Sequence, residues 1–369
     1  MKWLLPVVLL VSVPVRSQIQ PGDFEYQGAF AIDGEFDPQV EQWYAYGQRG
    51  LSYDPSFDSL WVTGHDHATT IVEIGIPPLV ISREWSELPV APVLTPAFDF
   101  AECLDSSFHM SGVEVHRDRI WVSCKHWYNT AGRDLATMYH RDAETLGDLQ
   151  GPFRAGRRSG KFHGSRQGAY LFSIPPDWAR EHLNRPLTLA TGFARGAGAF
   201  GGSQGPTIIA FHPRKPQKAK ALVFYREFFP ECLEDERECD FPGYRACDSW
   251  DGAAWVRSAA GDSVLISGVK AEGSNQYHPG GRDCSPYFGE ILFYDARDLA
   301  ASARRRVHPW EVVPYVRWRP REMWKSDHSF GGMAFDSRGG RLFVVEKSAG
   351  RNGRSIVHVW QTAPELTSE

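Results

Sequence analysis

The sequence predicts an all-β protein made of about five similar antiparallel sheets that stack side by side around an axis. The first observation is a repeat, in which a glycine-led strand, a turn and an apolar strand follow one another in the ranges 50–63, 112–123, 252–267 and 332–345. The second is the chemistry of the turns, since segments such as 54–58 and 336–340 are rich in Asp, Gly, Pro and Ser, as hairpin loops are. The third is that the apolar runs are nearly continuous, so both faces of each sheet must be covered.

The first residues have the layout of a secretory signal peptide. A charged start, Met1-Lys2, is followed by an apolar stretch over 3–13 and then by Pro14-Val15-Arg16-Ser17. We expect residues 1–17 to be removed and residues 18–369 to form a single domain. No stretch of the chain approaches the roughly 20 apolar residues that a membrane span needs.

Further strands extend each repeat outward. Third strands are predicted at 71–74, 169–172, 290–293 and 356–359, and fourth strands at 92–98, 185–191 and 315–319. A shorter unit covers 205–225, which gives about five units, although any count from four to seven is compatible with the pattern. The last unit has only three strands, so the segment 24–30 is predicted to supply the fourth and close the ring. Two insertions, 127–167 and 272–287, separate second from third strands.

Sheets that are covered on both faces and repeated in this way are typical of a β-propeller. The chain resembles the β-propeller superfamily over residues 24–362, and the segment 331–360 looks like the last blade of secreted bacterial propellers of the YVTN, lactonase and gluconolactonase-like kind. This resemblance implies a fold and, as a hypothesis, a hydrolase or lactonase activity. A β-sandwich of two sheets is the alternative architecture.

The six cysteines indicate an oxidising compartment, so the protein is expected to be secreted or periplasmic. Their places in the repeat favour the pairs Cys103 with Cys124, Cys247 with Cys284 and Cys232 with Cys239, although fourteen other connectivities remain open. The net charge of -5 gives no general attraction to nucleic acid. We expect a monomer without a nucleic-acid partner.

Alignment of the repeats gathers polar side chains at one end of the predicted propeller, where the innermost strands begin and the second strands finish. The residues directly before the glycines are Arg49, Ser111, Gln204, Asp251 and Gly331. Equivalent positions after the second strands are His65, Lys125, Val269 and Lys347, followed by Asp66, His126, Lys270 and Ser348. The opposite end receives mainly turn residues, so function is predicted at the histidine-rich end.

A metal site is one hypothesis for this end. His65 and His67 flank Asp66 in an extended segment and project to one side, and His126 could supply a further ligand. Imidazole ligands suit a divalent ion such as zinc, and calcium or manganese are alternatives. The alternative interpretation is that these two histidines are ordinary polar residues of a loop.

A metal-free hypothesis assigns acid–base chemistry to the same end. His328, Asp251 and His109 are the catalytic candidates, while Arg49 and Lys270 would stabilise negative charge. Asp251 with Arg49 could equally be a structural ion pair across the axial mouth. No Gly-x-Ser-x-Gly elbow, Walker loop or dinucleotide fingerprint accompanies these residues.

Aromatic residues on the same end favour a sugar-like ligand. Trp127 and Trp250 are expected to join Arg49, Asp66, Lys125 and Lys270 in binding a small polar or carbohydrate-like ligand. The leading hypothesis is therefore an exported propeller that binds such a ligand in a His-rich pocket. The alternatives are a metal-assisted hydrolase or lactonase that uses the same pocket, and a protein-interaction scaffold.

Overall fold

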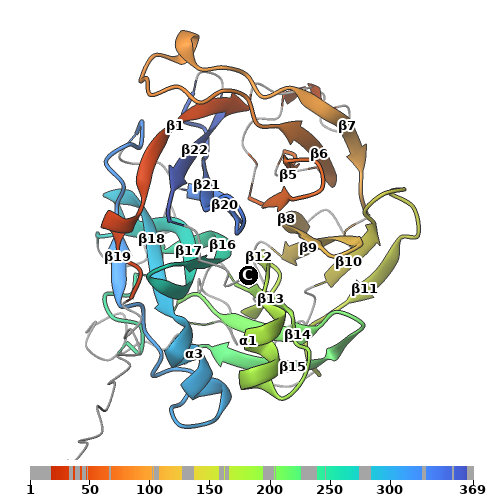
Figure 1. Ribbon diagram of the computed structural model, residues 1–369, viewed down its shortest axis with the longest axis vertical. Coiled ribbons are helices and arrows are strands. Elements are labelled where there is room, and N and C mark those ends of the chain that lie inside the picture. Colours follow the sequence, from red (N-terminus) through yellow and green to blue (C-terminus); the bar gives the residue numbers. More distant parts are fainter. Residues whose placement is uncertain are drawn as a thin grey trace, which may run out of the picture.

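The computed structural model describes residues 18–32, 36–37, 42–43, 47, 49–65, 68–101, 103, 108–126, 137–157, 162, 166–193, 203, 205–225, 239–245, 247–273, 284–325, 330–350 and 353–363. The chain is a five-bladed β-propeller, in which five four-stranded antiparallel sheets surround a central axis (Figure 1). This confirms the predicted fold class. The innermost strands contact one another in the cyclic order β4, β8, β12, β16, β20 and back to β4.

Each blade runs from the axis outward. The first blade is β4 (Leu51–Asp54), β5 (Ser59–Thr63), β6 (Thr70–Gly75) and β7 (Val93–Asp99). The second is β8 (Phe108–His116), β9 (Arg119–His126), β10 (Thr137–Asp142) and β11 (Gln150–Phe153). The third is β12 (Tyr170–Ser173), β13 (Leu189–Gly192), β14 (Ile208–His212) and β15 (Lys215–Val223).

The fourth blade is β16 (Ser249–Ser258), β17 (Gly261–Ala271), β18 (Tyr287–Asp295) and β19 (Val316–Trp318). The fifth is β20 (Phe330–Asp336), β21 (Arg341–Glu346), β22 (Ser355–Gln361) and β1 (Glu25–Ile32). The remaining elements are the short hairpin β2 (Phe36–Asp37) and β3 (Gln42–Trp43), the helices α1 (Pro176–Leu183) and α3 (Ala296–Ala303), and the 3₁₀ turns η1 (Pro21–Asp23) and η2 (Trp85–Glu87).

The ring is closed by the N-terminal strand, as predicted. β1 pairs antiparallel with β22, the last strand of the chain, from Glu25 opposite Gln361 to Ile32 opposite Ser355. Strand pairing between the two ends of the chain joins the first and last elements into one blade. Opening the ring would therefore break a whole ladder of backbone hydrogen bonds.

The core is divided among the interfaces between blades. Adjacent sheets share clusters of buried side chains, for example Trp61 with Val122 between the first and second blades, and Trp121 with Phe211 between the second and third. Because each sheet is packed on both faces, its strands need continuous apolar runs, which is the pattern that the sequence shows. The glycines that begin the inner strands allow this close approach. A Cβ on Gly252 would lie 2.3 Å from the carbonyl oxygen of Gly331 in the next blade.

The assignment of strands within the second and third blades was wrong. Residues 169–172 were predicted as the third strand of the second blade, but they form β12, the innermost strand of the third. The true outer strands, β10 and β11, lie inside the range 127–167 that was assigned to an insertion, and 205–225 is the outer half of the third blade. β11 is mostly exposed, so it lacks the apolar run by which strands were recognised.

Two of the predicted disulfides are present. Cys103 is joined to Cys124 and Cys247 to Cys284, with a Cα–Cα distance of 6.0 Å in each case. The predicted partner of Cys239, Cys232, lies outside the described residues. Among the residues that the structure describes, none of the helices is both long and apolar enough for a membrane span.

Candidate functional site at one end of the axis

The described site begins with four charged residues from four different blades. We call the end of the propeller at which the innermost strands begin the start face, and the opposite end the finish face. Arg49 lies two residues before the start of β4, Lys125 is the penultimate residue of β9, Asp251 lies near the start of β16, and Lys347 directly follows β21. The antiparallel topology places all four positions at the start face.

Asp251 is the centre of this group, and a local irregularity positions it. The register of β16 against β17 shifts between Trp250 and Gly252, so Asp251 has no cross-strand partner. Such bulges re-aim a side chain away from the regular pleat. We call Arg49, Lys125, Asp251 and Lys347 the start-face cluster.

Three cations contact the one carboxylate. Arg49 Nη1 lies 2.6 Å from Asp251 Oδ2, Lys125 Nζ lies 3.0 Å from Oδ1, and Lys347 Nζ lies 2.5 Å from Oδ2. Asp251 and Lys125 are buried, while the side chains of Arg49 and Lys347 keep 12% and 13% of their surface exposed. The cluster therefore reaches from the interior to the solvent at the axial mouth.

The cations control the protonation of the cluster. Burial by itself would raise the pKa of Asp251, but Arg49, Lys125 and Lys347 together hold that pKa well below its usual range. Burial lowers the pKa of Lys125 to about 8; Asp251 opposes this shift, while Arg49 and Lys347 add to it. Three cations from three other blades therefore share the single carboxylate of Asp251.

Lys270, a second predicted ligand-binding lysine, belongs to a separate pair at the same end. Its Nζ donates to Asp248 Oδ1 at 2.9 Å, and the same oxygen accepts from the backbone N–H of Ala271. Burial raises the pKa of Asp248 to about 6, against the effect of Lys270. This pair ties the start of β16 to the end of β17.

Three other predicted residues have definite places. Trp250 is 1% exposed and packs edge to face with Phe241, so it contributes to the core of the fourth blade and presents no open ring face. His109 stands opposite Lys125 in the pairing of β8 with β9, which puts the two side chains on the same face of the sheet. His65 is buried just after β5.

The remaining predicted site residues cannot be placed. Asp66, His67, Trp127 and His328 lie outside the described residues, and only the backbone of His126 is described, within β9. Within the described part of the chain, no group of three His, Cys, Asp or Glu side chains could hold a metal ion. The metal hypothesis at His65, His67 and His126, and the catalytic roles of His328, His109 and Asp251, stay predictions.

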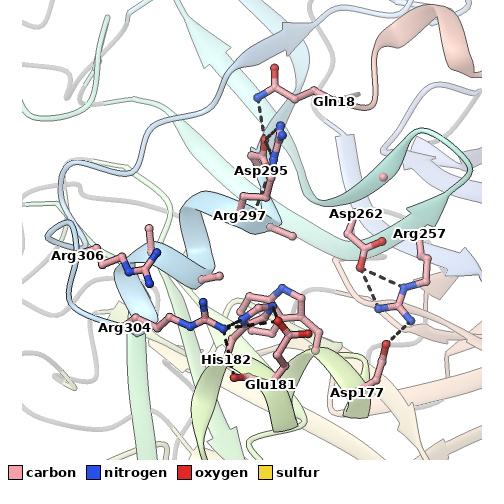
Figure 2. Close-up of a pocket in the computed structure, with 15 residues that line it drawn as sticks. Gln18, Asp177, Glu181, His182, Arg257, Asp262, Asp295, Arg297, Arg304 and Arg306 are labelled. Carbon is pink, nitrogen blue, oxygen red and sulfur yellow. Dashed lines mark hydrogen bonds and ion pairs between the residues drawn. The ribbon is translucent and has the colours of Figure 1, made fainter. Parts of the chain in front are cut away.

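The finish face contains two described cavities, although the sequence predicted mainly turn residues there. One, of about 400 Å³, lies beside α1 and α3, and its charged side chains pair with one another (Figure 2). Arg257 contacts both Asp177, at 3.0 Å, and Asp262, at 2.9 Å, while Arg297 pairs with Asp295. Arg257 and Asp177 also border the second cavity, which lies on the axis.

Comparisons with known proteins add only a general likeness. No family model matches the chain, and no curated protein matches it. Among solved structures, a luciferin-regenerating enzyme has a TM-score of 0.40 at 8% identity, covering 92% of this chain and 100% of the other. A Bombyx mori GH32 β-fructofuranosidase has a TM-score of 0.48 at 8% identity, covering 94% of this chain and 67% of the other. A member of the GH130 family of mannoside phosphorylases has a TM-score of 0.42 at 9% identity, covering 95% and 99%. No functional conclusion rests on likenesses this weak.

Proposed function

We propose that this propeller binds a small polar ligand with an anionic group, such as an acidic sugar, at the start-face cluster. The observation that carries the proposal is the convergence of three cations on a single carboxylate at the axial mouth. A cross-link between blades would need only one cation for Asp251. Arg49 and Lys347 also keep part of their side chains exposed beside this carboxylate, where an anionic group of a ligand can reach their N–H donors.

Asp251 also offsets the repulsion among the three cations and so prepares them for a ligand. Asp251 keeps Arg49, Lys125 and Lys347 in fixed positions before a ligand arrives, so little side-chain entropy remains to be lost on binding. The guanidinium of Arg49 suits a carboxylate, sulfate or phosphate group because its N–H donors are arranged as a planar fork. Partial burial weakens screening by salt.

The proposed setting is outside the cytoplasm. The predicted signal peptide, residues 1–17, and the two disulfides support an exported protein, because disulfides persist mainly in oxidising compartments. An extracytoplasmic protein would meet acidic sugars and other small anions directly.

Calorimetric titration of the chain from residue 18 onward tests the proposal. The probes are glucuronate and galacturonate, with glucose and galactose as neutral partners of the same shape. We expect binding of an acidic sugar at least about tenfold tighter than of its neutral partner, and weaker binding at high salt. The variants Arg49→Gln and Lys347→Met should lose this preference.

The matched controls are Arg214→Gln and Lys218→Met, which change exposed residues of the third blade. Both should bind as the unmodified protein does. The proposal would be overturned by equal affinity for acidic and neutral sugars, by binding that survives both cluster substitutions, or by no binding of either acid.

A further inference from the structure

The axial cavity at the finish face has a volume of about 430 Å³ and is formed by the ends of the innermost strands of all five blades. Arg117, Pro176 and Ser337 at its border are exposed, so the cavity opens to solvent. It is separate from the start-face cluster. The cavity lies at the C-terminal ends of the inner strands, whereas Arg49 and Asp251 lie at their N-terminal ends. We call it the finish-face cavity.

Polar groups from three blades line one side of this cavity. Ser52 Oγ of β4 donates to Glu114 Oε2 of β8 at 3.2 Å. Two residues further along β8, His116 Nδ1 lies 2.9 Å from Ser173 Oγ of β12, and its Nε2 lies 3.1 Å from Thr188 Oγ1.

The two contacts of His116 suit a neutral imidazole, because one ring nitrogen can donate to a hydroxyl group while the other accepts from one. Burial, with a smaller contribution from Arg117, lowers the pKa of His116 to about 4.

Glu114 differs in its partners from Asp177, the other acid that lines this cavity. Asp177 is paired with Arg257, at 3.0 Å. Glu114 accepts a hydrogen bond from the Ser52 hydroxyl, and no cation among the described side chains forms an ion pair with it. Burial raises the pKa of Glu114 to about 7. A cation beside this carboxylate would stabilise its ionised form.

The rest of the wall suits an apolar body. The rings of Tyr53, Phe172, Trp255 and Phe335 border the cavity together with the side chain of Met333. Tyr53 and Phe335 are only half-buried, so part of their surface remains accessible from the cavity mouth. Aromatic faces attract cations as well as apolar groups.

The charges that surround Glu114 favour a cation over an anion. Arg257 of β16 is held by Asp177 and Asp262, and Arg117 lies in the exposed turn directly after β8, next to Asp118 in the sequence. His116 is neutral at physiological pH for the reason given above. Together these groups supply at least as much negative as positive charge once Glu114 ionises.

We propose that the finish-face cavity binds a small organic ammonium ion with an aromatic or aliphatic body, and that Glu114 is its counter-ion. The ammonium group donates to the Glu114 carboxylate, and the body lies against the aromatic wall. When Glu114 is protonated before binding, the carboxylic acid releases its proton to the solvent as the R–NH₃⁺ group enters. The site is independent of the anion site proposed above.

Titration with 2-phenylethylamine tests this proposal, with 2-phenylethanol as a neutral partner of nearly equal shape. We expect the amine to bind at least about tenfold tighter than the alcohol, because only the amine can pair with the ionised carboxylate. Near pH 7, binding should release a fraction of a proton per ligand, which is measured by calorimetry in two buffers of different ionisation enthalpy.

The variant Glu114→Gln keeps the shape and an oxygen acceptor but cannot ionise. It should remove both the preference for the amine and the proton release, while Glu144→Gln, an exposed change on the same face, should alter neither. Thermal unfolding establishes that both variants are folded.

Three results would overturn the proposal. These are equal affinity for the amine and the alcohol, an amine preference that persists in Glu114→Gln, and no saturable binding of the amine up to about 10 mM. Binding of glucose that survives in Glu114→Gln would instead identify a neutral sugar site.

Discussion

The two ends of the propeller axis each hold an acid on an innermost strand, but the two acids have opposite properties. Asp251 at the start face contacts three cations, and its pKa lies well below the usual range. Glu114 at the finish face contacts hydroxyl groups, and its pKa rises to about 7. Burial alone would raise both values, so the charge of the partners decides which acid is ionised.

The difference separates two kinds of site within one fold. At the start face the Asp251 carboxylate stays ionised over the whole physiological pH range, because the surrounding cations stabilise its charged form. The finish-face cavity contains an acid whose charge responds to small changes in pH or to a bound cation. The same ring of strands therefore supports a permanent charge at one end and a variable charge at the other.

The substitution Asp251→Asn should have the greatest effect on stability. It leaves Arg49, Lys125 and Lys347 close together without their carboxylate, so we expect the free energy of unfolding to fall by about 3–5 kcal/mol at pH 7. Urea denaturation followed by tryptophan fluorescence measures this loss.

The control for that experiment is Asp118→Asn, whose side chain is 78% exposed, and it should change stability by less than about 0.5 kcal/mol. A loss below about 1 kcal/mol in Asp251→Asn would mean that the cations do not depend on this carboxylate.

Glu114→Gln should change the pH dependence of stability. The folded protein binds the Glu114 proton more tightly than the unfolded chain does, since the pKa rises from 4.5 to about 7. The contribution of Glu114 therefore falls as pH rises from about 4.5 to 7, by about 3 kcal/mol in total. The variant should lose this decline and gain relative stability above pH 7, as measured by urea denaturation at pH 5 and pH 8. An unchanged slope would refute the shifted pKa.

His116→Gln should act in the opposite direction. The pKa of His116 falls from 6.5 to about 4 in the folded protein, so its contribution to stability is complete above pH 6.5 and declines as the solution is acidified toward pH 4. The variant should flatten this decline, although lost hydrogen bonds to Ser173 and Thr188 should cost about 1 kcal/mol at pH 7. Denaturation curves at pH 7 and pH 5 distinguish the two effects, and a steeper acid decline in the variant would contradict the assignment.

Lys125→Met should have a small effect at pH 7, about 1 kcal/mol or less. Two cations still neutralise Asp251, and the methionine avoids the cost of burying an ammonium group. Because the pKa of Lys125 falls from 10.5 to about 8, its contribution to stability rises between those pH values, and the variant should lose that rise. Lys218→Met is the control for pH-dependent denaturation between pH 8 and 10. A loss as large as that of Asp251→Asn would show that all members of the cluster are equally necessary.

The sequence predicted the fold well because its signals are local. Hairpins such as 50–63 and 332–345 combine turn residues with apolar strands within a short stretch, and this pattern identified the inner strands of four blades. The outer strands were harder to recognise. β10 and β11 are short or exposed, so their composition differs little from that of a loop, and the strong apolar run at 169–172 was placed in the wrong blade.

The candidate site was predicted in part. The alignment of repeats put Arg49, Lys125, Asp251 and Lys347 at one end. Lys347 was identified only as a position equivalent to Lys125, without a predicted role. The alignment also did not show that three cations share one acid. Glu114 and His116 were missed altogether, because within β8 they look like ordinary polar residues of a strand. Their partners Ser52 and Ser173 belong to other blades.

The amino-acid sequence alone determined the repeated antiparallel unit, the closure of the ring by the first strand and the end of the axis at which Arg49, Lys125, Asp251 and Lys347 lie. The repeated unit follows from turns and apolar runs that are close together in the chain, and the closure follows from the missing fourth strand of the last unit. Only the tertiary structure decided which charges meet, and hence that Asp251 is ionised while Glu114 is poised near neutrality. Protonation depends on distances between side chains of different blades, such as Lys125 and Asp251, which come together only when the ring has closed.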